Sequence, residues 1–140
     1  MRIMGLDVGT KRIGVAVSDE LLLTAQGRTT IERKVLKDDL DEIANLAKDS
    51  SVSEIVVGLP LNMNGTYSAK TKEVVEFIGE LQQHIDIPVK TYDERLTTVQ
   101  VERTLIEADV SRAKRKRLSD KLAAQVILQG YLDSMRRTVK

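Results

Sequence analysis

Alternation of apolar and polar positions predicts three β-strands at the start of the chain. Close-set apolar residues mark strands over residues 2–8 and 13–17, separated by a turn over residues 9–12. A third strand is expected within residues 21–31, with a bulge or bend at Gln26 and Gly27. The first two strands should therefore form a hairpin, and the third should extend it as an antiparallel meander.

A period of 3.6 residues replaces this alternation in later segments, which predicts helices separated by short strands. We expect helices over residues 37–49, 68–84, 97–108 and 119–136, strands over residues 53–57 and 88–92, and a basic loop before the last helix. The order β-β-β-α-β-α-β-α-α requires right-handed crossovers between parallel strands. It predicts an α/β fold in one domain, residues 1–140, with a mixed five-stranded sheet and helices on its faces.

The composition excludes several kinds of catalytic and metal-binding site. The chain has no cysteine, which excludes disulfides, thiolate metal sites and cysteine nucleophiles. The single histidine, His84, excludes multi-histidine metal sites, and we interpret it as a structural or surface residue. An acid stands too early, at Asp7, for a signal peptide, and no apolar run approaches the ~20 residues of a membrane span. We therefore expect a cytoplasmic protein with no membrane partner.

Charge is unevenly distributed, although the total is only +1. Residues 1–110 carry 13 Lys and Arg against 19 Asp and Glu, whereas residues 111–140 carry 9 against 2. A basic segment beside an acidic body is typical of a polyanion-binding protein with a carboxylate metal site. A solvated basic loop with a frayed tail would have the same composition. The densest basic cluster consists of Arg112, Lys114, Arg115, Lys116, Arg117 and Lys121.

Asp7 stands at a strand position where burying a carboxylate costs free energy. Period-two alternation places Ile3, Gly5 and Asp7 on one face of an otherwise apolar strand. Burying a carboxylate there requires a partner, a proton or a metal ion. The alternative is that Asp7 only begins the turn that follows the strand.

Two further acids stand at comparable positions. Glu94 follows the strand expected over residues 88–92, at the strand end where ligands collect in α/β sheets. Asp120 begins the apolar stripe of the last expected helix. Both also have structural interpretations: Glu94 could open a solvated helix, and Asp120 could follow Ser119 as N-cap and be stabilised by the helix dipole.

Three acids on separate elements suit divalent cations such as Mg²⁺ or Mn²⁺, which prefer hard oxygen ligands. Two such ions about 4 Å apart can stabilise the attacking and leaving oxygens in phosphodiester hydrolysis, and neither histidine nor cysteine is required. Lys and Arg side chains beside the acids would then hold the substrate's phosphates. The residues therefore leave open a nuclease with one or two metal ions.

Four segments, in order along nearly the whole chain, resemble the YqgF family, also called RuvX. They are residues 5–19 (GLDVGTKRIGVAVSD), 55–66 (IVVGLPLNMNGT), 93–98 (DERLTT) and 120–128 (DKLAAQVIL). Family members are described as nucleases of precursor 16S ribosomal RNA or as Holliday junction resolvases. The resemblance implies a cytoplasmic protein with a ribonuclease H-like fold.

The resemblance also implies roles for individual residues. Asp7, Glu94 and Asp120 match the family's three acidic positions, which implies that they are catalytic and bind the metal. The loop of residues 58–66 and Arg95 would line the cleft. Together with the basic cluster, the match implies nucleic-acid-binding roles for Lys11, Arg12, Asn62, Asn64, Arg95, Lys114, Arg115, Lys116, Arg117 and Lys121.

Two departures from the family pattern bear on the mechanism. Asn64 stands where other members can carry Asp, so that loop lacks a negative charge. Related junction resolvases carry a fourth acid about one turn after the third, but here Ala123 and Ala124 occupy that turn. A missing ligand leaves the second metal ion, and therefore the full two-metal mechanism, open.

The expected function is a metal-dependent endonuclease that processes the 5′ end of precursor 16S rRNA. The alternatives are a Holliday junction resolvase, a non-catalytic nucleic-acid-binding module, and a nucleotide binder. The last follows from residues 7–11, which also resemble the first phosphate loop of the actin, Hsp70 and sugar kinase superfamily.

Candidate partners are structured nucleic acid, either precursor rRNA or a four-way DNA junction, and the ribosomal particle. Four aromatic residues are too few for a base-stacking platform, so the protein should read backbone shape. The protein is expected to be a monomer or a homodimer, since resolving a junction would favour two-fold symmetry.

Overall fold

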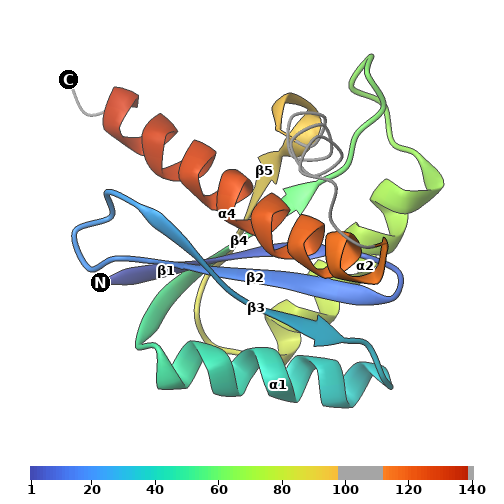
Figure 1. Ribbon diagram of the computed structural model, residues 1–140, viewed down its shortest axis with the longest axis horizontal. Helices are drawn as coiled ribbons and strands as arrows, with labels where there is room; N and C mark the ends of the chain where they lie inside the picture. The colour runs from blue at the N-terminus through green and yellow to red at the C-terminus, as the bar shows by residue number, and fades with distance from the viewer. Residues whose placement is uncertain (98–111, 139–140) are drawn as a thin grey trace.

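Five strands form one mixed sheet in the order β3-β2-β1-β4-β5 in the computed structural model, which describes residues 1–97 and 112–138 (Figure 1). Strand β1 pairs antiparallel with β2 and parallel with β4, and β4 pairs parallel with β5. The expected hairpin and mixed sheet are therefore confirmed. The elements are β1 (Arg2–Val8), β2 (Arg12–Ser18), β3 (Ala25–Glu32), α1 (Leu36–Asp49), β4 (Val52–Leu59), α2 (Ala69–His84), β5 (Val89–Asp93), the short 3₁₀ helix η1 (Glu94–Leu96) and α4 (Arg112–Thr138).

Strand β3 starts later than its apolar residues suggest. A turn precedes it, in which the Asp19 carboxylate accepts the backbone N–H groups of Leu23 and Thr24, and Leu22 has a φ of 60°. A bulge is present one residue beyond the expected Gln26 and Gly27, because β3 carries one extra residue, Arg28, opposite Val15 and Ala16.

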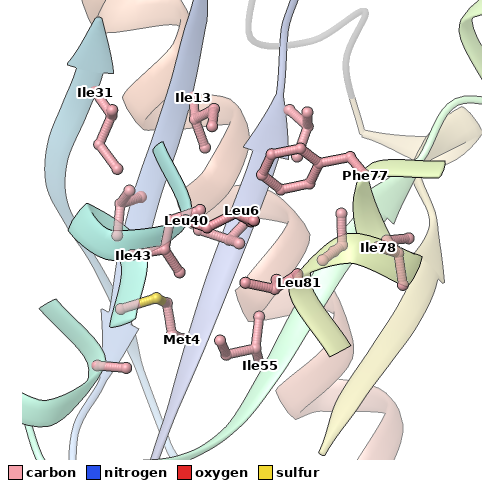
Figure 2. Packing of buried hydrophobic residues seen from close by; sticks show 14 of the residues in the cluster. Met4, Leu6, Ile13, Ile31, Leu40, Ile43, Ile55, Phe77, Ile78 and Leu81 are labelled. Atoms are coloured by element: carbon pink, nitrogen blue, oxygen red, sulfur yellow. The ribbon is translucent and has the colours of Figure 1, made fainter. Parts of the chain in front are cut away.

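Helices cover both faces of the sheet. Helices α1 and α2 pack on one face and α4 crosses the other (Figure 1). Alternate residues of β1 divide between the two layers, as period-two alternation requires. Met4 and Leu6 belong to the cluster under α1 and α2, which Figure 2 shows with Leu40 and Leu81, whereas Ile3 packs with residues of α4.

Most elements lie where the sequence pattern places them. Ser68 caps α2 through a reciprocal pair of hydrogen bonds with Thr71, which explains why that helix begins at Ala69. His84, in the last turn of α2, bonds through Nε2 to an Asp41 carboxylate oxygen of α1 at 2.8 Å, which agrees with its structural interpretation.

Helix α4 is the main correction. It begins at Arg112 rather than near Ser119, so the expected basic loop is helical from residue 112 on. Ser119 is therefore not an N-cap, and Asp120 is not in the first turn. The physical reason is that Arg, Lys, Ala and Leu are strong helix formers and no Gly or Pro interrupts them; their charge does not break the helix.

The helix expected over residues 97–108 falls outside the described residues except for Thr97, which lies in a turn. Within residues 1–97 and 112–138, no helix combines the length and apolar character that a membrane crossing needs.

Candidate active site

The first acidic residue, Asp7, lies near the end of β1 on the face that α4 covers. Gly5, two residues earlier, faces α4, where a Cβ would come within 2.7 Å of Leu128 Cβ. Asp7 pairs across the hairpin with Gly14 of β2. A Cβ on Gly14 would lie only 1.9 Å from the carbonyl oxygen of Asp120. The bare backbone at Gly14 therefore lets α4 bring Asp120 to the strand pair that carries Asp7.

The remaining acid, Glu94, reaches the same region from the end of β5. Glu94 begins η1 directly after β5, and its Oε2 atom lies 2.6 Å from the position that a Cβ would take on Gly58. Gly58 is in β4, one residue after Val57, which pairs with Leu6 of β1. A side chain at Gly58 would fill the space that Glu94 occupies beside Asp7.

The three acids form one electrostatic unit. Burial, and then the negative charges of Glu94 and Asp120, raise the pKa of Asp7 to about 7, while Lys70 acts in the opposite direction. Burial also raises the pKa of Glu94, which Lys70 lowers and Asp93 raises. The structure thus places Asp7, Glu94 and Asp120 together, as the sequence predicts, and adds Lys70 as their cationic neighbour.

The donor atoms of this unit are the kind that Mg²⁺ and Mn²⁺ prefer, because all are carboxylate oxygens. Crowded, partly buried carboxylates that raise one another's pKa are stabilised by a bound cation. Within the described part of the chain, however, no three acidic or imidazole side chains already converge into a closed ion site. The three acids therefore fit a divalent ion in the kind of donor atom that they offer.

A pocket of about 350 Å³ adjoins Asp120. Its walls are the turn between β1 and β2 and the first turn of α2: Gly9, Thr10, Lys11, Arg12, Lys70 and Asp120. Lys11 and Arg12 are thus next to the acidic unit, as expected. Lys70 is not among the site residues predicted from the sequence. A lysine in the first turn of a helix is unfavourable because it opposes the helix dipole, and this signal could have identified Lys70.

Arg33, also absent from the predicted set, braces this turn. Its Nη1 donates to the Gly9 carbonyl at 3.0 Å, its backbone N–H donates to the Lys11 carbonyl at 2.9 Å, and its Nε donates to Asp39 at 3.2 Å. Asp39 is only 1% exposed, and the guanidinium lies over the Phe77 ring. The turn that carries Lys11 and Arg12 is therefore tied to both α1 and α2.

The predicted loop residues lie near Glu94 but bond mostly among themselves. Arg95 forms a paired contact with the Asp93 carboxylate and donates to the Met63 carbonyl at 3.0 Å, which ties η1 to the loop of residues 58–66. The side chain of Asn62 donates to the Thr66 hydroxyl, and that of Asn64 accepts from the same residue. The two asparagines therefore support the shape of the loop.

The Lys121 stem runs over β3, where its Cγ is 3.0 Å from the Cβ position of Gly27. The structure describes the backbone of Lys114, Arg115, Lys116 and Arg117, which lies in α4.

Comparison with known proteins gives the same family that the motifs resemble. A family model described as "RuvX: Holliday junction resolvase" matches residues 1–134. A protein from Desulforamulus reducens, named "Putative pre-16S rRNA nuclease", is 55% identical over 96% of this chain and 98% of its own length. A protein of the same name from Clostridium novyi is 53% identical over 96% of this chain and all of its own length.

Solved structures agree on the fold. The RuvC protein of T. thermophilus, determined with a Holliday junction substrate, matches with a TM-score of 0.59 over 99% of this chain and 98% of that one, at 15% identity. The Fowlpox virus resolvase, determined with Holliday junction DNA, matches with a TM-score of 0.55 over 96% and 99%, at 12% identity. These likenesses confirm the expected ribonuclease H-like fold.

Proposed function

The chain belongs to the RuvX family and is a nuclease of phosphodiester bonds, and we propose that it processes the 5′ end of precursor 16S rRNA with the aid of a divalent metal ion. One observation carries the proposal for the site: Asp7, Glu94 and Asp120 come from three distant segments to one edge of the sheet, beside a pocket lined by cations. The choice of RNA rests on the names of the most similar relatives.

Asp7, Glu94 and Asp120 would hold Mg²⁺ or Mn²⁺, which supplies positive charge for the reacting phosphate and lowers the pKa of water. The protein's own groups do the rest. Burial at the edge of the sheet limits the water around the carboxylates and so strengthens their electrostatic interactions. Asp7 must lose its proton before it can bind a cation. Lys11 and Arg12 hold backbone phosphates at the rim of the site.

The test compares wild-type protein with Asp7→Asn on two labelled substrates, an RNA spanning the 5′ end of precursor 16S rRNA and a four-way DNA junction. We expect Mg²⁺- or Mn²⁺-dependent cutting of the RNA that falls at least about 100-fold in the variant, while binding changes little. Asp86→Asn, an exposed acid between α2 and β5, is the matched control and should cut at the wild-type rate. Cleavage by the Asp7→Asn variant at the wild-type rate would overturn the site assignment.

A Holliday junction resolvase is the second candidate, because the family description and the fold of junction-bound RuvC both favour it. Cutting of the junction alone would assign the protein to recombination. If neither substrate is cut but salt-sensitive binding persists, the protein is a binding module, and the carboxylates have another role.

A further inference from the structure

Lys70 occupies a position that helix stability does not explain. It is the second residue of α2, where a positive charge faces the positive end of the helix dipole. Its Nζ donates to the Thr10 hydroxyl at 3.2 Å and lies 3.9 Å from a carboxylate oxygen of Glu73. The first contact joins α2 to the turn between β1 and β2, 60 residues earlier in the chain.

The pocket that Lys70 closes is held in shape by the main chain. The Gly9 N–H donates to the Arg12 carbonyl at 2.8 Å, and Arg33 bonds the carbonyls of Gly9 and Lys11. These bonds set the backbone from which the side chains of Lys11 and Arg12 project. Protein groups alone therefore hold this backbone, so little ordering of it is needed when a ligand binds.

The charge of the pocket selects an anion. Among the described residues, three of the six that line it are cationic, Lys11, Arg12 and Lys70, against one carboxylate, that of Asp120. Arg12 pairs through its Nε with Glu32 at 3.2 Å, and its guanidinium carries further N–H groups that can donate to an anion. Lys70 lines the same pocket as Asp120 and bonds to Thr10, so it connects the acidic unit with the basic turn.

We propose that this pocket binds a phosphate group of the substrate backbone next to the one that is cut, and that the Lys70 ammonium is its principal contact, with Lys11 and Arg12 as further contacts. The proposal rests on the proposed function for the nature of the substrate. It adds a binding subsite and a residue from α2 to the acidic unit. Because Lys70 and Asp120 line the same pocket, a phosphate held by the Lys70 ammonium keeps the neighbouring phosphodiester at the carboxylates.

The test measures binding without cleavage. Affinity for the same RNA and for the four-way DNA junction is measured in EDTA over a range of salt concentrations for wild type, Lys70→Ala, Lys70→Arg and Lys72→Ala. Lys72 is the matched control, since it is an exposed lysine of the same helix outside the pocket. We expect Lys70→Ala to bind about tenfold more weakly and to lower the log–log salt slope by about 0.9 on the duplex arms of the junction. Lys70→Arg should retain most of the affinity, and Lys72→Ala should match wild type.

A purely structural role for Lys70, as a counter-ion of the acidic unit, predicts a different result. Lys70→Ala would then change thermal stability but leave the salt slope at the wild-type value, which overturns the proposal. An equal loss of slope in Lys72→Ala would overturn it too, because any surface cation would then suffice. Thermal-shift titration with inorganic phosphate separates the two sources of the ligand. Suppose that inorganic phosphate raises the melting temperature only when Lys70 is present, while Lys70→Ala leaves the log–log salt slope of nucleic-acid binding unchanged. That result would mean a site for free phosphate and would overturn the assignment to the nucleic-acid backbone.

Failure of this inference is distinguishable from failure of the proposed function. Lys70-dependent binding without any cleavage would contradict only the nuclease assignment. Metal-dependent cleavage with Lys70-independent binding would contradict only the subsite.

Discussion

At the scale of the residue, the informative feature is the partly buried carboxyl group of Asp7, whose pKa is raised to about 7 by burial and by two neighbouring acids. A carboxyl whose pKa is higher in the folded than in the unfolded protein stabilises folding at low pH, and that contribution is lost as the pH rises through the folded value. Above pH 7, the charged Asp7 therefore opposes folding unless a cation neutralises it. The charged carboxylate therefore lowers folding stability in exchange for a group that can take part in catalysis.

We therefore expect Asp7→Asn to melt several degrees higher than wild type at pH 8 in metal-free buffer, because the amide carries no charge to bury. The difference should nearly vanish around pH 4, where Asp7 of the wild type is protonated. Thermal unfolding at the two pH values measures this, with Asp86→Asn as control. A lower melting temperature for Asp7→Asn at pH 8 would mean that a hydrogen bond of the ionised carboxylate outweighs its burial.

At the scale of the element, the close approach of α4 to the sheet decides whether the site forms. Glycines in the strands make that approach possible, among them Gly14 under the Asp120 backbone and Gly58 under Ile127 and Glu94. Neither needs to be glycine for a left-handed backbone, since both lie within strands. Their function is to leave room, so a side chain at either position would push apart the elements that carry the acids.

Gly14→Ala should therefore destabilise the protein by about 2–4 kcal/mol and abolish cleavage, because the added Cβ would lie 1.9 Å from the Asp120 carbonyl oxygen and α4 would have to shift. Gly79→Ala is the matched control. A Cβ on Gly79 of α2 would meet nothing within 4 Å, so this change should stabilise the helix by about 0.5–1 kcal/mol. Denaturant unfolding checks both, and equal stability of the two variants would show that α4 can shift without cost.

At the scale of the whole molecule, charge is divided between parts of the chain. The first 110 residues are net acidic, and the last 30 carry 9 Lys and Arg against 2 acids. Because α4 begins at Arg112, the basic cluster is arranged along a helix that crosses the sheet on the same face as Asp7 (Figure 1). Such a helix can follow a nucleic-acid backbone beyond the site itself.

Replacing Lys114, Arg115, Lys116 and Arg117 together by Gln should weaken binding similarly on RNA and DNA and lower the log–log salt slope by about 2 to 3. Gln is a good helix former, so the fold should persist. Lys37→Gln with Lys48→Gln in α1, on the other face of the sheet, is the control and should leave the slope unchanged. An unchanged slope in the fourfold variant would mean that α4 carries its charge for solubility alone.

Apolar periodicity and turn residues predict the strands, the hairpin and the mixed sheet, and the family resemblance points to the three acidic positions. Hydrophobic periodicity and turn residues are local signals, and Asp7 is conspicuous because it interrupts an apolar strand. The start of α4 was not determined, because a charged helix and a charged loop have the same composition. Only the tertiary structure brought Lys70 and Arg33 to the site. Their side chains meet Thr10 and Gly9 through packing between segments far apart in the chain, and such contacts leave no periodic trace in a single sequence.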